Sequence, residues 1–357
     1  MRKVWALLSV FFSLLALPCV AFAHEVYVLT PQEITESLNM PAFNMLAVIK
    51  ADLSNFLFWA FLGILTVIAV FLISISRFLE ERLDPFFERT RKYAAPIARV
   101  TVGLSFLAAA YYQASYGPEL PLASSFGSWS GVITGILITI GILITLGVYA
   151  RIAALVALIL YAFAVWHHGW YMLTYTNYLG EILVLLILGV HHGIGPAENT
   201  NQSGFFPGLR RMYERVASTL APYSMLLLRV CFGVSLLYAS LYAKILHNNL
   251  ALLVAELPLA GHTHGIAYYF GLEPHFMVLG AAIIEIVIAL FFIFGIEIRF
   301  TALFLEFWLS LSLMYFGEVV WPHVILIGIP IAFICYGYDK YSLEGFFFKR
   351  SGFEPVL

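Results

Sequence analysis

The chain has 357 residues, of which 62% are hydrophobic and only 11% are charged. A soluble chain carries about a quarter charged residues, so the composition excludes an ordinary water-soluble protein and indicates an all-α, polytopic membrane protein. Basic residues are few, and the formal net charge is −2, which leaves membrane lipid as the expected partner and gives no sign of nucleic acid. The three cysteines form no CxxC pair, so no disulfide framework is expected.

The N-terminus has the pattern of a secretory signal peptide over residues 1–23. Two basic residues precede an apolar run at 4–20, and Ala21-Phe22-Ala23 forms a small-residue cleavage site. An uncleaved signal anchor is the alternative. Cleavage would make His24 the first residue of a polar external segment, 24–53.

Nine apolar runs follow, each near the length of about 20 residues that crosses a bilayer. They lie at 54–76, 96–116, 129–149, 151–168, 178–194, 223–246, 275–296, 300–317 and 321–338. Basic residues gather in every second connecting segment, which is the positive-inside bias of membrane proteins. We therefore expect a bacterial-type inner-membrane protein with its mature N-terminus outside and its C-terminus in the cytoplasm.

The chain contains an internal repeat. Arg99–Leu107 recurs as Arg229–Leu237 at an offset of 130 residues, whereas Gly147 recurs as Gly295 at an offset of 148. The second copy has therefore gained 18 residues, in the stretch 247–274. The predicted organisation is one first span (54–76), a cytoplasmic linker (77–95), repeat one (96–200), a cytoplasmic amphipathic linker (201–222), a parallel repeat two (223–345) and a cytoplasmic tail (346–357).

Arginines and glycines recur at matching places in the two repeats. We expect the arginines to be snorkelling anchors at the inner membrane surface, with Arg299 also available as a counter-ion for Glu297 or for a cofactor head group. The recurring glycines let neighbouring helices approach closely.

Each repeat opens with an Arg-Val-x-x-Gly helix and continues with a Gly-x-x-x-Arg hairpin, and repeat two closes with Tyr341-Ser342-Leu343-Glu344. This pattern, with Glu285 early in the second helix, resembles the four-helix DoxX (DoxD-like) family over residues 95–345. Asp339 departs from the second glycine of the family's closing turn, and repeat one lacks both the glutamate and the Ser-Leu turn. The resemblance implies a membrane subunit of a quinone-linked oxidoreductase, with quinone as a cofactor and a periplasmic or membrane redox subunit as a partner.

Two carboxyls, Glu285 and Glu306, stand within predicted spans of repeat two. At 1.5 Å per residue their depths differ by only about 6 Å, and their counterparts in repeat one are Leu137 and Leu158. An ionisable group at this depth is costly and marks a functional site by default. The pair is the candidate catalytic, proton-accepting site beside a quinone; the alternative is that each carboxyl hydrogen-bonds a neighbouring helix.

Histidines gather on the predicted outer side, with the closest pair, His262 and His264, inside the inserted stretch. Neutral imidazoles suit zinc or copper, although H-x-H alone is not diagnostic and a solvated polar loop is the alternative. A mature N-terminal His24 could chelate copper through its amine and ring nitrogen. The candidate metal ligands are His24, His247, His262, His264, His275 and His323.

Trp166-His167-His168-Gly169-Trp170 marks the outer end of the predicted span 151–168. An aromatic belt at the membrane surface explains the tryptophans, and His167 and His168 could instead line a quinone head-group pocket. The predicted function is the membrane subunit of a quinone-linked redox complex. A metal or small-solute transporter is one alternative, weakened because secondary transporters commonly use inverted repeats, and a non-catalytic scaffold is another.

Overall fold

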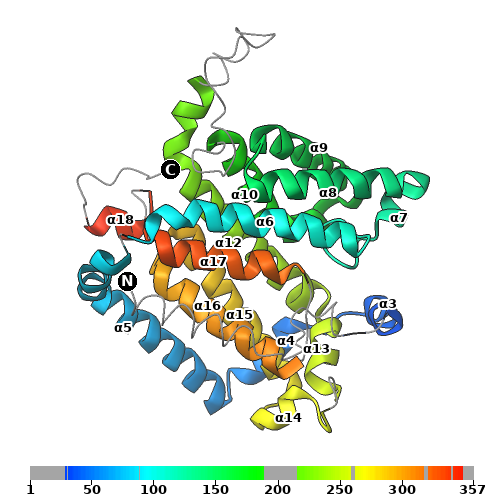
Figure 1. The fold of residues 1–357 in the computed structure, drawn as a ribbon. Coiled ribbons are helices and arrows are strands. Elements are labelled where there is room, and N and C mark those ends of the chain that lie inside the picture. Colours follow the sequence, from blue (N-terminus) through cyan, green and yellow to red (C-terminus); the bar gives the residue numbers. More distant parts are fainter. Residues whose placement is uncertain are drawn as a thin grey trace, which may run out of the picture.

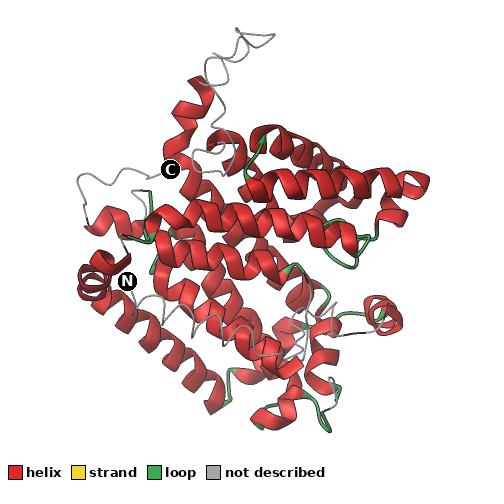
Figure 2. Cartoon of the chain, viewed as in Figure 1, coloured by secondary structure: helices red, strands yellow, loops and turns green. Residues whose placement is uncertain are grey.

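The computed structural model describes residue 29 and residues 31–87, 89–188, 215–258, 262–316, 321–338 and 341–348. The predicted signal peptide, His24 and most of the linker 201–222 lie outside these ranges. The described residues form helices and no strand, apart from one isolated bridge between Ala114 and Pro121, as Figure 2 shows. The all-α prediction is confirmed.

The first half of the chain contains α3 (Pro31–Asn39), α4 (Met45–Asp52), α5 (Phe56–Phe87), η1 (Arg91–Tyr93), α6 (Ala94–Tyr111), α7 (Leu122–Phe126), η2 (Gly127–Trp129), α8 (Ser130–Leu146), α9 (Ala150–His168), η3 (Gly169–Tyr175) and α10 (Thr176–Leu188). The second half contains η4 (Ala221–Tyr223), α12 (Ser224–Ser240), η5 (Leu241–Leu246), α13 (Asn248–Glu256), α14 (Ile266–Phe270), α15 (Pro274–Phe294), α16 (Ile298–Phe316), α17 (His323–Tyr336) and α18 (Leu343–Phe348). We call α6, α8, α9 and α10 unit one, and α12, α15, α16 and α17 unit two.

Seven helical stretches in the described part of the chain are long and apolar enough to cross a membrane. This finding supports a polytopic membrane protein, but it differs from the nine spans predicted. Two predicted spans fall in one continuous apolar stretch, Ala150–Leu188, and α17 has only 14 residues. The first helix also differs, because α5 continues to Phe87 instead of ending at residue 76.

The elements of the two units have matching bounds. With the offset of 130, η1 and the start of α6 fall on η4 and the start of α12. With the offset of 148, α9 falls on α16 at both ends, and the last residues of α8 and α10 fall on those of α15 and α17. The two offsets read from the sequence therefore also relate the helix boundaries.

The helical hairpins of the two units turn in the same way. Gly147 (φ +75°) and Gly295 (φ +67°) end α8 and α15 in the left-handed region, where glycine has no Cβ penalty. Two residues later Tyr149 (φ +50°) and Glu297 (φ +49°) repeat that conformation, which is uncommon for residues with side chains. The short α8–α9 and α15–α16 links thus have the same geometry despite different side chains.

Glycines set the closest helix contacts within each unit. A Cβ on Gly103 of α6 would lie 2.8 Å from the backbone nitrogen of Thr145 on α8. A Cβ on Gly233 of α12 would lie 2.8 Å from the carbonyl oxygen of Ala289 on α15. Both helix pairs pack extensively, and small residues permit this approach.

The first helix of each unit packs against the last helix of the other. Extensive contacts join α6 to α17 and α10 to α12, and Figure 1 shows α6 and α17 side by side. Gly328 on α17 meets Thr101 on α6, and Gly180 on α10 meets Cys231 on α12. The two contacts are equivalent under the sequence offsets, so the two units pack against each other through α6, α10, α12 and α17.

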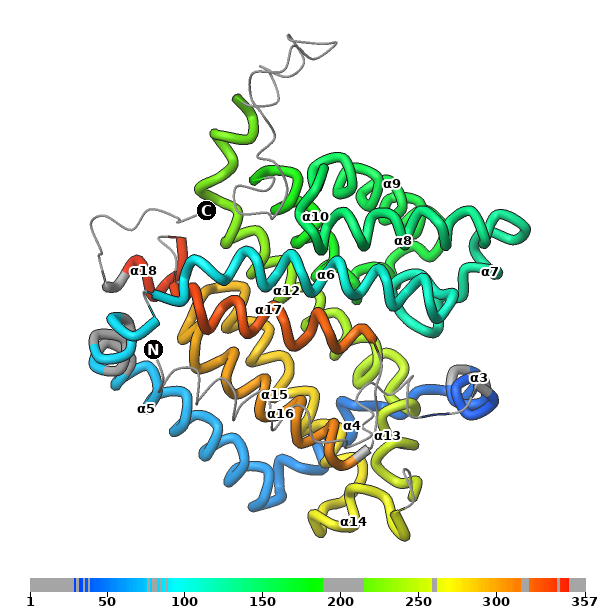
Figure 3. The backbone as a smooth tube through the Cα atoms, viewed as in Figure 1, coloured from blue at the N-terminus to red at the C-terminus, as the bar shows by residue number. Residues whose placement is uncertain are grey.

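The residues inserted in unit two form α13 and α14, which pack beside the N-terminal segment at one end of the molecule (Figure 3). The Asn248 side chain accepts a hydrogen bond from the Phe43 N–H (3.0 Å) and donates one to its carbonyl oxygen (2.8 Å). A second small apolar cluster forms there, around Met45, Phe58 and Phe276. The insertion therefore gives the N-terminal segment a docking site.

Two arginines expected to snorkel are buried instead. Arg229 and Arg299 are each 1% exposed. Arg229 Nη1 donates to the Ile293 carbonyl oxygen at 2.8 Å, and Arg299 Nε donates to the Ile334 carbonyl oxygen at 3.0 Å. These carbonyls lie at the C-terminal ends of α15 and α17, where a cation is favourable. The arginines therefore donate hydrogen bonds to the C-terminal ends of helices inside the protein, which corrects the prediction that they are anchors at the membrane surface.

Candidate functional site

Glu285, one of the two predicted catalytic carboxyls, forms an ion pair. Its Oε2 lies 2.9 Å from Nζ of Lys244, and the side chains are 25% and 10% exposed, respectively. Lys244 belongs to η5, a π-helical turn that continues α12, and such turns are frequent at functional sites. Lys244 lies near the end of the predicted span 223–246, and the sequence alone gives no sign that it pairs with Glu285.

Glu306, the second predicted carboxyl, is buried on α16, and its Oε1 has no hydrogen-bond partner among the described residues. The neighbouring positions Ala302 and Leu305 belong to the main apolar core. The two carboxyls thus have different surroundings, one paired with a lysine and the other in apolar packing. Oε1 of Glu306 makes no hydrogen bond to Glu285.

The histidines predicted as metal ligands pack mainly against aromatic rings. His262 stacks on Tyr315 with ring centroids 4.4 Å apart and donates from Nε2 to the Tyr315 carbonyl oxygen at 2.8 Å. His264 lies on Tyr268, and His247 lies beside Tyr242. His275 donates from Nδ1 to Glu273 at 2.6 Å, and His323 is buried at the start of α17.

No three His, Cys, Asp or Glu side chains come together as a metal site would need, within the residues that the structure describes. His24 lies outside those residues. Metal binding at the outer rim therefore stays a prediction. His262 and His264 share contacts with the Tyr269 ring, whereas His247 and His275 lie against other rings.

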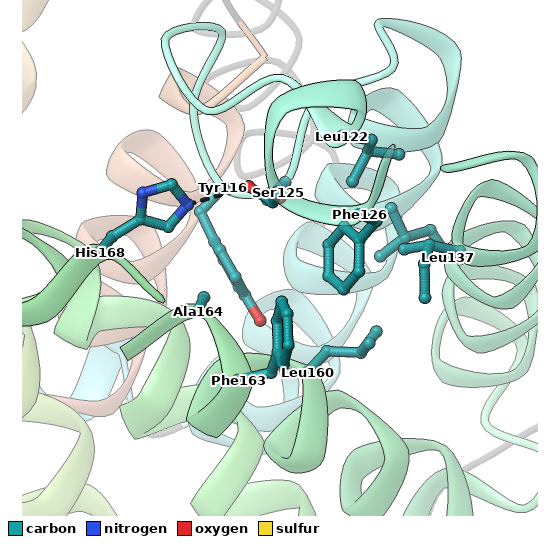
Figure 4. A pocket seen from close by; sticks show the side chains of 11 residues that line it. Tyr116, Leu122, Ser125, Phe126, Leu137, Leu160, Phe163, Ala164 and His168 are labelled. Carbon is teal, nitrogen blue, oxygen red and sulfur yellow. Dashed lines mark hydrogen bonds between the residues drawn. The ribbon is translucent and has the colours of Figure 1, made fainter. Parts of the chain in front are cut away.

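His168, predicted to line a quinone pocket, lines a cavity in unit one. Its Nε2 shares a 3.0 Å hydrogen bond with Oγ of Ser125 (Figure 4). The adjacent His167 is exposed, with its ring against that of Phe163. Arg299, the third residue predicted to bind a cofactor, lies in unit two with its guanidinium over the Phe87 ring. Of the three residues predicted to bind a cofactor, His168 lines this cavity, whereas His167 and Arg299 do not.

The cavity lies between α7, α8, α9 and the loop that follows α6, and it contains about 320 Å³ of unfilled space, part of it open to the outside. The rings of Phe126 and Phe163 stack with centroids 4.7 Å apart. The Tyr116 side chain extends along the cavity (Figure 4), and its hydroxyl has no hydrogen-bond partner among the described residues. Other lining residues are Ser115, Leu122, Ile133, Leu137, Leu160 and Ala164. A mostly apolar wall thus carries a few polar groups.

Glu119 fastens the loop over this cavity to η3. Its Oε1 accepts hydrogen bonds from the hydroxyls of Tyr171, at 2.9 Å, and Tyr175. Burial raises the pKa of the Glu119 carboxyl, although the bonds from these two tyrosines oppose the shift. The same carboxyl packs against Gly117, where a Cβ would overlap it. The loop carrying Tyr116 is therefore tied to the segment that follows His168.

A further buried carboxyl, Glu181 on α10, was missed at the sequence level. It is 2% exposed and accepts a 3.4 Å hydrogen bond from Oγ1 of Thr101 on α6. One turn away, Ser105 and Tyr178 share a 2.8 Å hydrogen bond between the same two helices. The signal was present, because Glu181 stands inside the predicted span 178–194, as Glu285 does inside its own.

No family model, no curated protein and no solved structure matches the chain. The resemblance to the DoxX family therefore stays a prediction that rests on the residues quoted for it. Composition and fold together establish a polytopic, α-helical membrane protein.

Proposed function

We propose that the chain is the quinone-binding membrane subunit of a redox complex, built from two parallel, DoxX-like four-helix repeats. The cavity of unit one carries the proposal. A quinone head group is a flat ring with two carbonyl oxygens, so its site needs aromatic or aliphatic walls and a few hydrogen-bond donors. Phe126 and Phe163 supply ring surfaces, while the Tyr116 hydroxyl and the His168–Ser125 pair supply polar groups.

The cavity is small in this structure. Its enclosed space is about 10 Å³, room for about one water molecule, and the 320 Å³ of unfilled space includes the part open to the outside. A head group would therefore enter only if side chains of the cavity wall move apart. Electrons would come from a partner redox subunit, which is the part of the proposal that the resemblance implies.

The proposed site is in unit one, whereas the carboxyls Glu285 and Glu306 are in unit two. Glu285 is held by Lys244, and its side chain is therefore less available to a ligand. The matched helix bounds, hairpin turns and glycine contacts support the two-repeat organisation. In this proposal both units supply the scaffold and unit one supplies the ligand site.

The test is a binding titration of the purified full chain in detergent with a short-chain ubiquinone analogue, followed by quenching of tryptophan fluorescence. We expect saturable quenching in the wild type and a Kd about tenfold higher for Phe163→Ala and for His168→Ala, equivalent to about 1.4 kcal/mol each. The matched control is Leu311→Ala, which changes the position equivalent to Phe163 in unit two. Quenching that does not saturate, or equal Kd values for Phe163→Ala and Leu311→Ala, would refute the proposal.

A further inference from the structure

The short helix α14 exposes three consecutive aromatic side chains at one end of the molecule (Figure 3). Tyr268, Tyr269 and Phe270 are 66%, 49% and 65% exposed, respectively, whereas Ala267 is buried. Single exposed apolar residues are ordinary, but a contiguous group of them marks a surface that contacts a protein or a membrane. We call Tyr268, Tyr269 and Phe270 the aromatic patch.

Two membrane-spanning helices fix the depth of the aromatic patch. Only three residues separate Phe270 from Pro274, the first residue of the span formed by α15, and a chain of this length reaches at most about 14 Å. The Tyr269 ring also lies against the ring of Tyr315, with centroids 6.1 Å apart, and Tyr315 ends the span formed by α16. Because α15 and α16 are the antiparallel arms of one hairpin (Figure 1), both of these ends lie on the same side of the membrane. The patch therefore lies near the boundary between the hydrocarbon core and the head groups.

The direction of α14 is fixed by its neighbours. Gly265, which precedes the helix, packs so closely on the last carbonyl groups of α13 that a Cβ would overlap them. Ala267 and Leu272, on either side of the aromatic patch, pack in the small apolar cluster that contains Phe276. His262 stacks on Tyr315 and so ties the segment before α14 to the end of α16. The exposed face of α14 therefore has one direction relative to the two spans.

The chemistry of the aromatic patch suits the surface of a lipid bilayer. A tyrosine ring has an apolar body and a hydroxyl group that can stay hydrated, which is why tyrosine is enriched where the hydrocarbon core meets water. The patch has a polar edge, because the Tyr269 hydroxyl lies 3.3 Å from Oγ1 of Thr263. No lysine or arginine occurs between residues 244 and 299, so attraction to anionic lipid head groups adds little.

Unit one has no such patch at the corresponding place. Its five-residue helix α7 precedes α8 as α14 precedes α15, but Leu122 of α7 is buried and Phe126 packs on Phe163 in the wall of the cavity. The residues inserted in unit two therefore turn aromatic side chains outward, whereas α7 turns its apolar side chains inward. Since the shared scaffold does not need an exposed aromatic helix, the patch needs an explanation of its own.

We propose that α14 is a membrane anchor that inserts Tyr268, Tyr269 and Phe270 into the head-group layer of the bilayer beside α15 and α16. The partner is the lipid surface, which is recognised by aromatic side chains and not by charge. Asn248 of α13 holds the Phe43 backbone, so the anchor also keeps the N-terminal segment at the membrane surface. This inference stands apart from the proposed function, because it needs no ligand in the cavity.

Spin labels on the full chain in phosphatidylcholine vesicles test the depth of α14. The label is attached to Phe270→Cys, or to Tyr268→Cys, after the three natural cysteines have been replaced by alanine. Collision rates are measured with oxygen, which concentrates in the bilayer, and with a water-soluble nickel chelate. The references are Ile64→Cys on α5 and Thr263→Cys at the polar edge of the aromatic patch, both at exposed positions.

The labels at 268 and 270 should collide with the nickel chelate about tenfold less often than the label at 263, which corresponds to about 1.4 kcal/mol for transfer of the chelate. Their oxygen collision rates should stay below that of the label at 64, which lies in the hydrocarbon core. Nickel collision rates at both positions equal to that at 263 would overturn the proposal. Protection found only in native membranes, where another protein could cover the patch, would also overturn it. The midpoint of thermal unfolding, compared with that of the cysteine-free chain, reports whether each labelled variant is folded.

The lipid composition of the vesicles tests how the surface is recognised. Replacing part of the phosphatidylcholine by anionic phosphatidylglycerol should leave the collision rates at 268 and 270 unchanged, because the aromatic patch has no lysine or arginine beside it in the sequence. Labels that lie deeper in the anionic vesicles, and that return toward the water when salt is added, would overturn recognition by aromatic side chains.

Discussion

Unit one and unit two place equivalent glycines at equivalent helix contacts, yet they bury different polar groups. Unit one has the buried Glu181 carboxyl, hydrogen-bonded to Thr101, and the cavity with Tyr116 and His168. Unit two has the Lys244–Glu285 ion pair and the isolated carboxyl of Glu306. At the position equivalent to each of these carboxyls, the other unit has an apolar residue.

The comparison separates features that both units share from features that only one unit has. Turn conformations and glycine contacts recur, so they belong to the scaffold. The buried polar groups occur once each, and their cost inside a membrane makes them candidates for function. Function is argued from such sites and not from the fold that carries them.

The largest expected effect on stability comes from Lys244→Ala. Position 244 of unit two is equivalent to position 114 of unit one, which is already alanine. The change removes the ammonium group that pairs with Glu285, and removing one member of a buried ion pair costs about 3–5 kcal/mol. Because the Glu285 side chain is 25% exposed, we expect about 3 kcal/mol, measured as a fall in thermal stability in detergent. The double variant Lys244→Ala/Glu285→Leu should recover most of the loss, and equal stabilities of the single and double variants would contradict the pairing.

Gly103→Ala and Gly233→Ala should have similar effects if the two units share one scaffold. Each added Cβ would lie under 3.0 Å from backbone atoms of the facing helix, and such overpacking costs about 1–3 kcal/mol. Gly135→Ala on α8 is the control, since a Cβ there meets nothing within 4 Å. The measurement is the midpoint of thermal unfolding. If only one of the two variants, Gly103→Ala or Gly233→Ala, lost stability, the two helix contacts would not be equivalent.

A smaller effect that depends on pH is expected at Glu119 in unit one. Because burial raises the pKa of this carboxyl above its ordinary value of 4.5, the native state holds the proton more tightly than the unfolded state. Its contribution to stability is complete below pH 4.5 and is lost as the pH rises through the raised pKa. The difference in Tm between wild type and Glu119→Gln should therefore fall as the pH is raised; a constant difference would exclude this titration.

The smallest effect, with the opposite sign, is expected at Glu273 in unit two. Partial burial would raise the pKa of Glu273, but bonds from His275 and from the Phe276 N–H outweigh it and lower the pKa below 4.5. The stability that this N-cap contributes is present above pH 4.5 and is lost as the pH falls through the lowered pKa. Glu273→Ala should cost about 0.5 kcal/mol at neutral pH, since the side chain is 59% exposed. A loss that grows on acidification would contradict the assignment.

Much of the helical layout could be predicted from the sequence, because local signals determine it. The span predicted at 300–317 is α16, Ile298–Phe316, and the tight links were marked by Gly147 and Gly295. The end of α5 was missed because its polar continuation forms helix as far as Phe87. Apolar length and turn glycines are local properties, whereas the inserted helices α13 and α14 depend on packing against the N-terminal segment.

The polar contacts could not be predicted because their partners are far apart in sequence. Lys244 meets Glu285 only through the π-helical end of α12, and Thr101 meets Glu181 across 80 positions. The repeat revealed which residues were unusual but not which of them touch. His168 could be selected from its place at a predicted span end, whereas Ser125 and Tyr116 became its neighbours only in the folded chain.

The pairing of α6 with α17 also constrains the order of assembly during synthesis. The face of α6 that carries Thr101 is made early, but its partner Gly328 is on α17, the last helix of unit two. Until α17 has been inserted, that face of α6 lacks the helix of unit two that covers it. Neither unit can therefore reach its final packing alone.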